Sequence, residues 1–254
     1  MKTIIITGAG TGIGAATAKA LAADRETALI LLGRRLEILE SLRSELPNAE
    51  NHECISADVS NLNSIKSALA EANLGEKNVV GLFANAGVGG ENHYDADDRW
   101  DEIINTNLTG VYHCIMETLP FLLKSEEPFK NIVVTSSILA RFGVPNHTAY
   151  CASKTGLLGL VKSLAVQHAS NGLLVNAICP GWVETDMAKA GIQDLANRQE
   201  TSYEEAYKTQ MSFLPTGKMS QPEEIANLVK FLLTNQETSI TGQALDINNG
   251  AFML

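Results

Sequence analysis

A tyrosine and a lysine in the second half of the chain have a spacing that suits proton transfer. Tyr150 and Lys154 stand four residues apart at the start of an apolar helical stretch, so they lie on one helix face. A free phenol has a pKa near ~10 and is a poor base at neutral pH, so a nearby positive charge must stabilise its phenolate. Ser137 stands thirteen residues before Tyr150, at the end of the apolar run NIVVTSS. Taken singly, the three residues also have structural explanations: a core tyrosine, a snorkelling lysine and a strand-end cap.

A second candidate site lies near the N-terminus, where an apolar run ends in a glycine-rich turn. Residues 7–14 read TGAGTGIG, and a helical pattern follows at once. They fit T-G-x-x-x-G-x-G, not the stricter G-x-G-x-x-G, and no Gly-Lys-Ser/Thr of a P-loop follows. A turn without side chains lets a pyrophosphate approach the backbone N–H groups at a helix N-terminus. The turn therefore indicates a dinucleotide site, although a ligand-free strand–helix turn has the same composition.

The end of the second apolar run bears on which dinucleotide this is. An NAD site usually places Asp or Glu there for the ribose 2′-OH, whereas this chain has Gly33, Arg34 and Arg35. No carboxylate repels a 2′-phosphate, and a guanidinium can bind it in bidentate fashion. The sequence favours NADP(H) bound by Arg34 and leaves NAD(H) possible, with one of the two arginines opening a solvated helix.

Short apolar runs alternate with helical patterns along the chain. The predicted strands are 3–7, 28–32, 53–57, 79–84, 131–136, 173–178 and 244–247, and the predicted helices are 13–23, 36–46, 61–72, 99–123, 149–168 and 222–233. Continuous apolar runs suit strands covered on both faces. We therefore predict an α/β fold with a doubly wound, seven-stranded parallel sheet and helices on both faces, a Rossmann-like single domain over residues 1–254. Ligands of such sheets gather at the carboxyl ends of the strands.

One segment interrupts this alternation of apolar runs and helical patterns. Residues 185–219 are polar and poorly periodic, with weak helical patterns. A long irregular excursion inside a compact domain is more often a functional lid than a packing element. We expect residues 185–219 to cover the substrate.

Composition and charge exclude several classes of function. The 254 residues carry 19 basic and 29 acidic side chains, a formal charge of −10, which repels a nucleic-acid backbone. The chain shows no secretory signal and no run of ~18 apolar residues, so we expect no membrane partner and a cytoplasmic protein. The four cysteines are far apart, which predicts reduced, mostly buried thiols and no metal.

Together these features resemble the short-chain dehydrogenase/reductase family. The motifs that carry the resemblance run in order along the whole chain: TGAGTGIG at 7–14, Asp58-Val59, ANAG at 84–87, Asn107, Ser137, Tyr150, Lys154, Pro180-Gly181 and ITGQALDINNG at 240–250. Three positions depart from the family pattern. Ala84 replaces a frequent asparagine, Thr11 stands where many NADP-preferring members have a basic residue, and Asn248-Asn249-Gly250 replaces a common D-G-G.

The resemblance implies a role for each catalytic residue. Tyr150 would give a proton to a carbonyl oxygen during reduction and take it back during oxidation. Lys154 would supply positive charge and bond the nicotinamide ribose, and Ser137 would hold the substrate oxygen. Asn107 would position a water that links Lys154 to solvent. Ser136 competes with Ser137 on composition, and the family's spacing to the tyrosine selects Ser137.

The resemblance also implies the cofactor contacts. The expected cofactor-binding residues are Gly8, Gly10, Thr11, Gly12, Ile13, Gly14, Arg34, Asp58, Val59, Asn85, Gly87, Tyr150, Lys154, Pro180, Gly181, Val183 and Thr185. Asp58 and Val59 would meet the adenine, and Pro180, Gly181 and Val183 would pack against the nicotinamide.

The sequence looks most like 3-oxoacyl reductases and polyketide ketoreductases over residues 81–110 and over the tail of the predicted lid. This likeness implies a small carbonyl substrate, namely a β-keto thioester. It also implies a homo-oligomer, either a tetramer or a dimer. NAD(H)-dependent hydroxyacyl, hydroxybutyrate and steroid alcohol dehydrogenases share the same motifs and stay open. A non-catalytic NADP sensor would not need Tyr150 and Lys154. An epimerase usually needs a longer C-terminal region.

Overall fold

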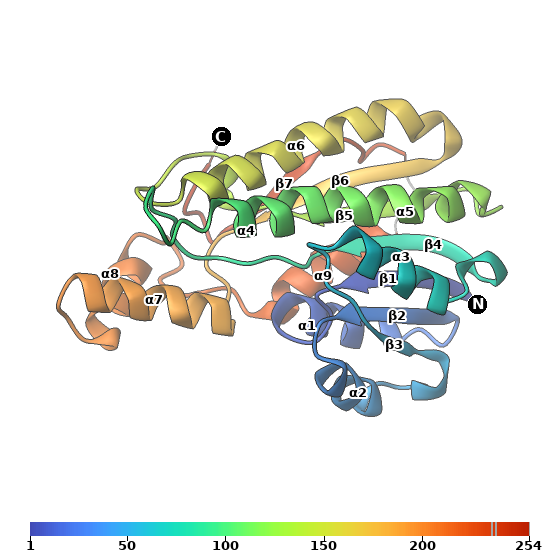
Figure 1. The fold of residues 1–254 in the computed structure, drawn as a ribbon, viewed down its shortest axis with the longest axis horizontal. Helices are drawn as coiled ribbons and strands as arrows, with labels where there is room; N and C mark the ends of the chain where they lie inside the picture. The colour runs from blue at the N-terminus through green and yellow to red at the C-terminus, as the bar shows by residue number, and fades with distance from the viewer. Residues whose placement is uncertain (235, 237, 254) are drawn as a thin grey trace.

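A parallel sheet forms the centre of the structure, a computed structural model that describes residues 1–234, 236 and 238–253 (Figure 1). Within these residues the sheet has seven strands: β1 (Lys2–Thr7), β2 (Thr27–Gly33), β3 (Glu53–Ser56), β4 (Asn78–Ala84), β5 (Lys130–Thr135), β6 (Leu173–Pro180) and β7 (Ala244–Ile247). They lie in the order β3-β2-β1-β4-β5-β6-β7 with every neighbouring pair parallel. The predicted fold class is confirmed, and the predicted strand ends agree to within two residues.

Helices cover both faces because consecutive side chains of each strand point to opposite sides. Ile4 and Ile6 of β1 face a core shared with α1 (Gly12–Ala22), α2 (Leu36–Glu45) and α9 (Pro222–Thr234). Ile5 faces the other core, shared with α3 (Leu62–Glu71), α5 (Gly110–Lys124) and α6 (Thr148–His168). Each strand is thus apolar on both sides, which is why its sequence shows no alternation.

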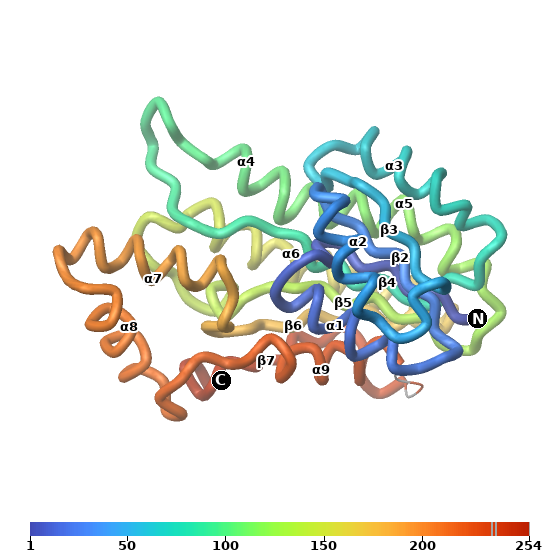
Figure 2. Tube along the Cα trace, turned by 90° about the horizontal axis from the view of Figure 1, so that it is seen from below, coloured from blue at the N-terminus to red at the C-terminus, as the bar shows by residue number. Residues whose placement is uncertain are grey.

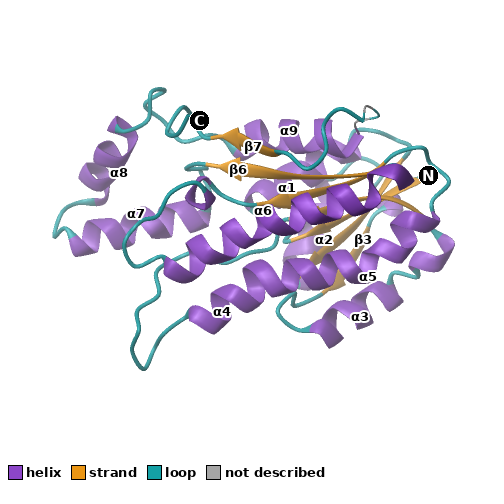
Figure 3. Cartoon of the chain, turned by 90° about the horizontal axis from the view of Figure 1, so that it is seen from above, coloured by secondary structure: helices purple, strands orange, loops and turns teal. Residues whose placement is uncertain are grey.

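The strand order reverses between β1 and β4, which are neighbours in the sheet although β2 and β3 lie between them in the chain. Such a reversal opens a crevice at the carboxyl ends of the strands. The segment that joins β4 to α4 (Trp100–Ile104) lies at this end of the sheet, together with α7 (Asp186–Arg198) and α8 (Tyr203–Ser212) (Figure 3).

The predicted helix over 99–123 is wrong in one respect, because a π-helical turn interrupts it. The structure has α4 (Trp100–Ile104), a π-helical turn over Asn105–Thr109, and then α5. Gly110 ends this turn against the backbone of Val59, where an added Cβ would lie 2.5 Å from the carbonyl oxygen. A π-helical turn inserts one extra residue into a helix, and the spacing of apolar residues hardly shows it. The sequence pattern therefore predicts one continuous helix.

The segment 185–219 is more regular than its sequence predicts. It forms α7 (Asp186–Arg198) and α8 (Tyr203–Ser212), which project beyond the strand ends (Figure 2). A small apolar cluster holds them together: Ala188, Ile192, Ala196, Ala206, Met211, Leu214 and Met219. Ser202 and Glu205 form a capping box at the start of α8, in which the exposed side chain of Glu205 stabilises the helix end.

The structure also bears on membrane-spanning helices and on the state of the cysteines. No helix of the described residues is long and apolar enough to cross a membrane. All four cysteines are free thiols; Cys114 and Cys179 are buried, whereas Cys54 and Cys151 are half-buried. The expectation of mostly buried thiols is therefore met by two of the four.

The packing of Gly110 gives a test of the π-helical turn. Gly110→Ala should lower the free energy of unfolding by about 1–3 kcal/mol, because the new methyl group meets the Val59 carbonyl. Gly159→Ala, on the exposed face of α6 with nothing within 4 Å of the new Cβ, should raise it by about 0.5–1 kcal/mol, the ordinary helix propensity gain. Urea unfolding measures both. The same sign for the two substitutions would contradict the close approach at Gly110.

Candidate active site

A cavity of about 990 Å³ opens at the carboxyl ends of the strands. Its lining includes nearly all the residues that the sequence nominates: Gly8, Gly10, Thr11, Gly12, Ile13, Arg34, Asp58, Val59, Asn85, Gly87, Ser137, Tyr150, Lys154, Pro180, Gly181, Val183 and Thr185. Gly14 and Asn107 do not line it. The single cavity therefore brings the glycine turn and the tyrosine–lysine pair together.

The glycine turn has no room for side chains. Gly8 has a φ of +65°, and a Cβ there would lie 2.8 Å from the Cα of Ala86. A Cβ on Gly14 would collide with the carbonyl oxygen of Gly8, so Gly14 packs beneath the turn. The turn leads directly into α1. The side chain of the N-cap residue, Thr11, makes no hydrogen bond to the backbone N–H groups that the structure describes in the first turn of this helix. A bare turn on a helix N-terminus suits a pyrophosphate, so the residues present fit a dinucleotide.

The rim beyond β2 carries positive charge. Arg34 and Arg35 are exposed and line the cavity, and Arg34 forms no ion pair with any residue that the structure describes. The carboxylate of Asp58 accepts hydrogen bonds from Ser60 N (3.0 Å) and Ser60 Oγ (2.7 Å). These bonds, and to a smaller extent the charge of Arg34, hold the pKa of Asp58 below its usual value. Arg34 is thus free to meet an anion, whereas the Asp58 carboxylate is engaged within its own loop.

Polar groups tie the ends of β1, β4 and β5 together. The Asn85 amide donates to the carbonyl oxygens of Thr7 and Gly8, both at 3.3 Å, and accepts from the Thr135 hydroxyl at 3.1 Å. The Thr7 hydroxyl oxygen accepts from the backbone N–H of Asn85 at 3.0 Å. Asn85 therefore shapes the floor of the cavity by holding three strand ends in place.

The ammonium group of Lys154 is buried beneath the cavity. Lys154 is 4% exposed, and its Nζ donates to the carbonyl oxygen of Thr135 at 2.8 Å. The same Nζ lies 5.6 Å from the centroid of the Tyr150 ring. Burial disfavours the charged form and lowers the pKa of Lys154 to about 8.

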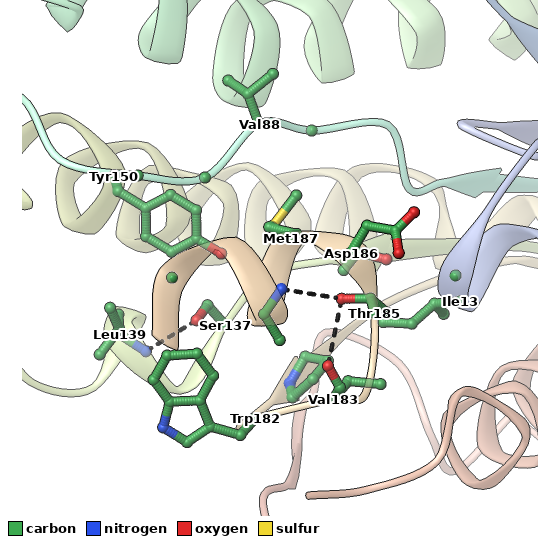
Figure 4. A pocket seen from close by; sticks show the side chains of 18 of the residues that line it. Ile13, Val88, Ser137, Leu139, Tyr150, Trp182, Val183, Thr185, Asp186 and Met187 are labelled. Atoms are coloured by element: carbon green, nitrogen blue, oxygen red, sulfur yellow. Dashed lines mark hydrogen bonds between the residues drawn. The ribbon is translucent and has the colours of Figure 1, made fainter. Parts of the chain in front are cut away.

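Tyr150 and Ser137 direct their hydroxyl groups into the pocket (Figure 4). Burial raises the pKa of Tyr150, and the nearby Ser137 hydroxyl offsets part of that rise. The Ser137 hydroxyl oxygen also accepts from the backbone N–H of Leu139 at 3.1 Å. The neighbouring Ser136 does something else: its hydroxyl donates to the carbonyl oxygen of Lys154 at 2.8 Å. The two serines therefore differ in function, since Ser136 braces α6 against β5 and Ser137 faces Tyr150.

Asn107 lies behind the cavity wall, fully buried in the π-helical turn. Its Oδ1 accepts from the backbone N–H of Val88, and its Nδ2 donates to the Val88 carbonyl oxygen, both at 2.8 Å. A Cβ on Gly87 would lie 3.1 Å from Asn107 Oδ1 and 3.5 Å from Lys154 Nζ. Asn107 thus holds residues 87–88, in the segment after β4, over Lys154. The water relay implied by the resemblance stays a prediction.

The far wall of the cavity is apolar, and no pattern in the sequence predicts it. Its large side chains are Phe142, Val144, Trp182, Met187, Leu195, Phe213 and Leu214. Trp182 directly follows Gly181 of the Pro180-Gly181 motif. The others come from loops, from α7 and from the residues directly after α8, where no periodic pattern marks one side as facing the cavity. At the rim, an ion pair between Glu91 and Arg198 joins the segment after β4 to the end of α7.

Comparisons with known proteins agree with this geometry. A profile of the short chain dehydrogenase family matches residues 2–196. The 3-oxoacyl-[acyl-carrier-protein] reductase FabG of Staphylococcus aureus is 31% identical, with 99% of this chain and 98% of that protein covered, and FabG of Vibrio harveyi is 33% identical, with 100% and 98% covered. A variant of actinorhodin polyketide ketoreductase, solved with NADPH, superposes with a TM-score of 0.91 at 32% identity over 98% of this chain and 97% of that one. Levodione reductase has a TM-score of 0.88 at 27% identity over 98% and 96%.

The buried charge of Lys154 makes a prediction about stability. Its pKa is about 8 in the folded state and ordinarily 10.5, so between these values the unfolded chain keeps a proton that the folded chain has lost. The free energy of unfolding therefore gains a contribution that rises with pH in this window, by up to about 3 kcal/mol in full. Urea unfolding at pH 7.5 and pH 10 should show the wild type gaining stability relative to Lys154→Met. An identical pH dependence in both proteins would contradict the desolvation of Lys154.

Proposed function

Because the chain belongs to the short-chain dehydrogenase family, whose enzymes act on hydroxyl and keto groups with NAD(P)(H), we propose that it reduces a ketone with NADPH, its first candidate substrate being a 3-oxoacyl thioester. The observation that carries this proposal is the buried Lys154 ammonium group beneath Tyr150, in the same cavity as the glycine turn. A sensor of the dinucleotide would have no use for a phenol held beside that charge.

In the proposed reaction Tyr150 donates its phenolic proton to the carbonyl oxygen of the substrate. NADPH, when bound along the glycine turn, supplies the hydride. Ser137 orients the same oxygen, since its hydroxyl lies beside that of Tyr150. The charge of Lys154 stabilises the phenolate that the transfer leaves behind, and it acts strongly because little solvent screens it.

The remaining residues of the cavity hold the cofactor in this proposal. Pro180, Gly181 and Val183 would pack against the nicotinamide, and Asp58 and Val59 would meet the adenine. Arg34 would bind the 2′-phosphate, which is why NADPH is favoured over NADH. Among the described residues that line the cavity next to Arg34, only Asp58 carries a carboxylate. That carboxylate already accepts a hydrogen bond from Ser60.

The substrate class rests on the apolar wall and on the relatives. Phe142, Trp182 and Met187 make that wall suitable for an acyl chain or a ring next to the reacting carbonyl. The FabG relatives, at 31% and 33% identity, are named 3-oxoacyl-[acyl-carrier-protein] reductases. We also propose that α7 and α8 act as the lid over this substrate. A homo-oligomer and a cytoplasmic location stay predictions of the sequence.

A substrate panel tests the proposed reaction. Acetoacetyl thioesters, cyclic ketones and steroid ketones are each mixed with NADPH, and loss of absorbance at the nicotinamide band is followed. We expect turnover of at least one class, with acetoacetyl thioesters fastest. Tyr150→Phe should lower kcat by at least about 100-fold, because general acid catalysis is lost, while NADPH binding measured by fluorescence persists. Full activity in Tyr150→Phe would refute the assigned proton donor.

The cofactor preference has its own test. Arg34→Ala should lower kcat/KM for NADPH about 10- to 100-fold, the contribution of a charged hydrogen bond, and leave kcat/KM for NADH nearly unchanged. NADH is the internal control, since it differs only in lacking the 2′-phosphate. Equal use of both cofactors by the wild type, or an unchanged ratio in the variant, would overturn the NADP(H) assignment.

A further inference from the structure

The helix that carries Tyr150 begins without a cap of its own. The residue before α6 is His147, which makes no side-chain hydrogen bond to the described first-turn amides; its Nδ1 instead lies 2.9 Å from the carbonyl oxygen of Pro145. The first N–H groups of any helix lack partners within the helix, and an uncapped end frays. Tyr150 is the third residue of α6, so fraying of this end would move the phenol directly.

A residue from a distant segment supplies the missing cap. Asn92 lies between β4 and α4, and its Oδ1 accepts from the backbone N–H of Ala149 at 2.9 Å. The hydroxyl of Thr148 lies 3.1 Å from Oδ1 and 3.0 Å from Nδ2 of the same amide. The backbone N–H of Asn92 donates to the carbonyl oxygen of Asn146 at 2.8 Å. Asn92 is only 7% exposed, so water competes little for these bonds.

Asp98 fixes which way the Asn92 amide faces. The Asp98 carboxylate, which only accepts hydrogen bonds, takes one from Asn92 Nδ2 at 3.2 Å and one from the backbone N–H of Trp100 at 3.1 Å. Because Nδ2 must turn towards Asp98, Oδ1 must turn towards Ala149. The pair Asp98–Asn92 thus connects the start of α4 to the start of α6.

We propose that Asn92 is a positioning residue for catalysis, which holds Tyr150 against Ser137 and Lys154 by capping α6 from another segment. The inference rests on the proposed function, in which Tyr150 is the proton donor. Asn92 itself is absent from the described lining of the cavity, although Glu91 beside it lines the rim, so it acts through the helix. Displacements near 1 Å at a reacting group can cost about 100-fold in rate.

Kinetics of Asn92→Ala test this role. We expect kcat for ketone reduction to fall about 10- to 100-fold, with KM for NADPH unchanged because the glycine turn and Arg34 do not contact Asn92. Asn61→Ala is the matched control, since Asn61 Oδ1 caps α3 through the N–H groups of Asn63 (2.9 Å) and Ser64 (3.2 Å). It removes an equivalent cap and should keep wild-type kcat at saturating NADPH. A wild-type kcat in Asn92→Ala overturns the proposal.

A charge swap separates positioning from general loss of structure. Asn92→Asp keeps the acceptor for Ala149 but sets two carboxylates against each other, so it should also lose kcat. Adding Asp98→Asn restores a donor between the two side chains, and the double variant should recover at least about half of the wild-type kcat. Failure of the double variant to recover overturns the proposal.

Hydrogen exchange makes the outcome independent of the proposed reaction. Peptides that cover residues 146–152 should exchange faster in Asn92→Ala than in the wild type, and as slowly as the wild type in the double variant. Unchanged exchange in Asn92→Ala overturns the cap. If the wild type reduces no ketone in the panel, the proposed function fails, while the exchange data still decide whether Asn92 holds the start of α6.

Discussion

The burial of one positive charge governs the geometry of this site. Lys154 places its ammonium group where water hardly reaches it, with the carbonyl oxygen of Thr135 at 2.8 Å and the face of Tyr150 at 5.6 Å. Desolvating a charge is costly, and its pKa falls accordingly. The fold tolerates this cost only because β5 and α6 present those two partners at fixed positions. A shift of either element would leave the charge without compensation.

Those positions are fixed by a chain of polar contacts that crosses the sheet. Thr7, Asn85 and Thr135 link the ends of β1, β4 and β5, and Ser136 then bonds the backbone of α6 at Lys154. The same groups that close the ends of the strands therefore set the height of Lys154 beneath the cavity. Because the glycine turn starts at the end of β1, the dinucleotide end and the proton-transfer end of the cavity share one framework.

Much of this arrangement could be predicted from the sequence, for a physical reason. Strands buried on both faces appear as continuous apolar runs, and chemistry at their carboxyl ends leaves small polar residues directly after those runs, as with Ser137 and the turn at 7–14. The π-helical turn around Asn107 and the trans cap by Asn92 escaped prediction. Both depend on a single backbone carbonyl or amide meeting a distant side chain, which no periodicity records. The apolar wall from α7 and from the residues after α8 escaped it too, because some of its side chains, such as Leu195 and Leu214, also pack into the small core between those helices.

The two displaced pKa values in the site act in the same sense for the proposed reduction. A raised pKa keeps Tyr150 protonated at neutral pH, as a proton donor requires, and the lowered pKa of Lys154 near 8 still leaves its ammonium charged there. Once the proton has left, the unscreened ammonium stabilises the phenolate more than it stabilised the neutral phenol, which is a contribution specific to the transition state. The environment of this one pair therefore keeps the phenol protonated and the ammonium charged at neutral pH, which is the state from which the proposed proton donation starts.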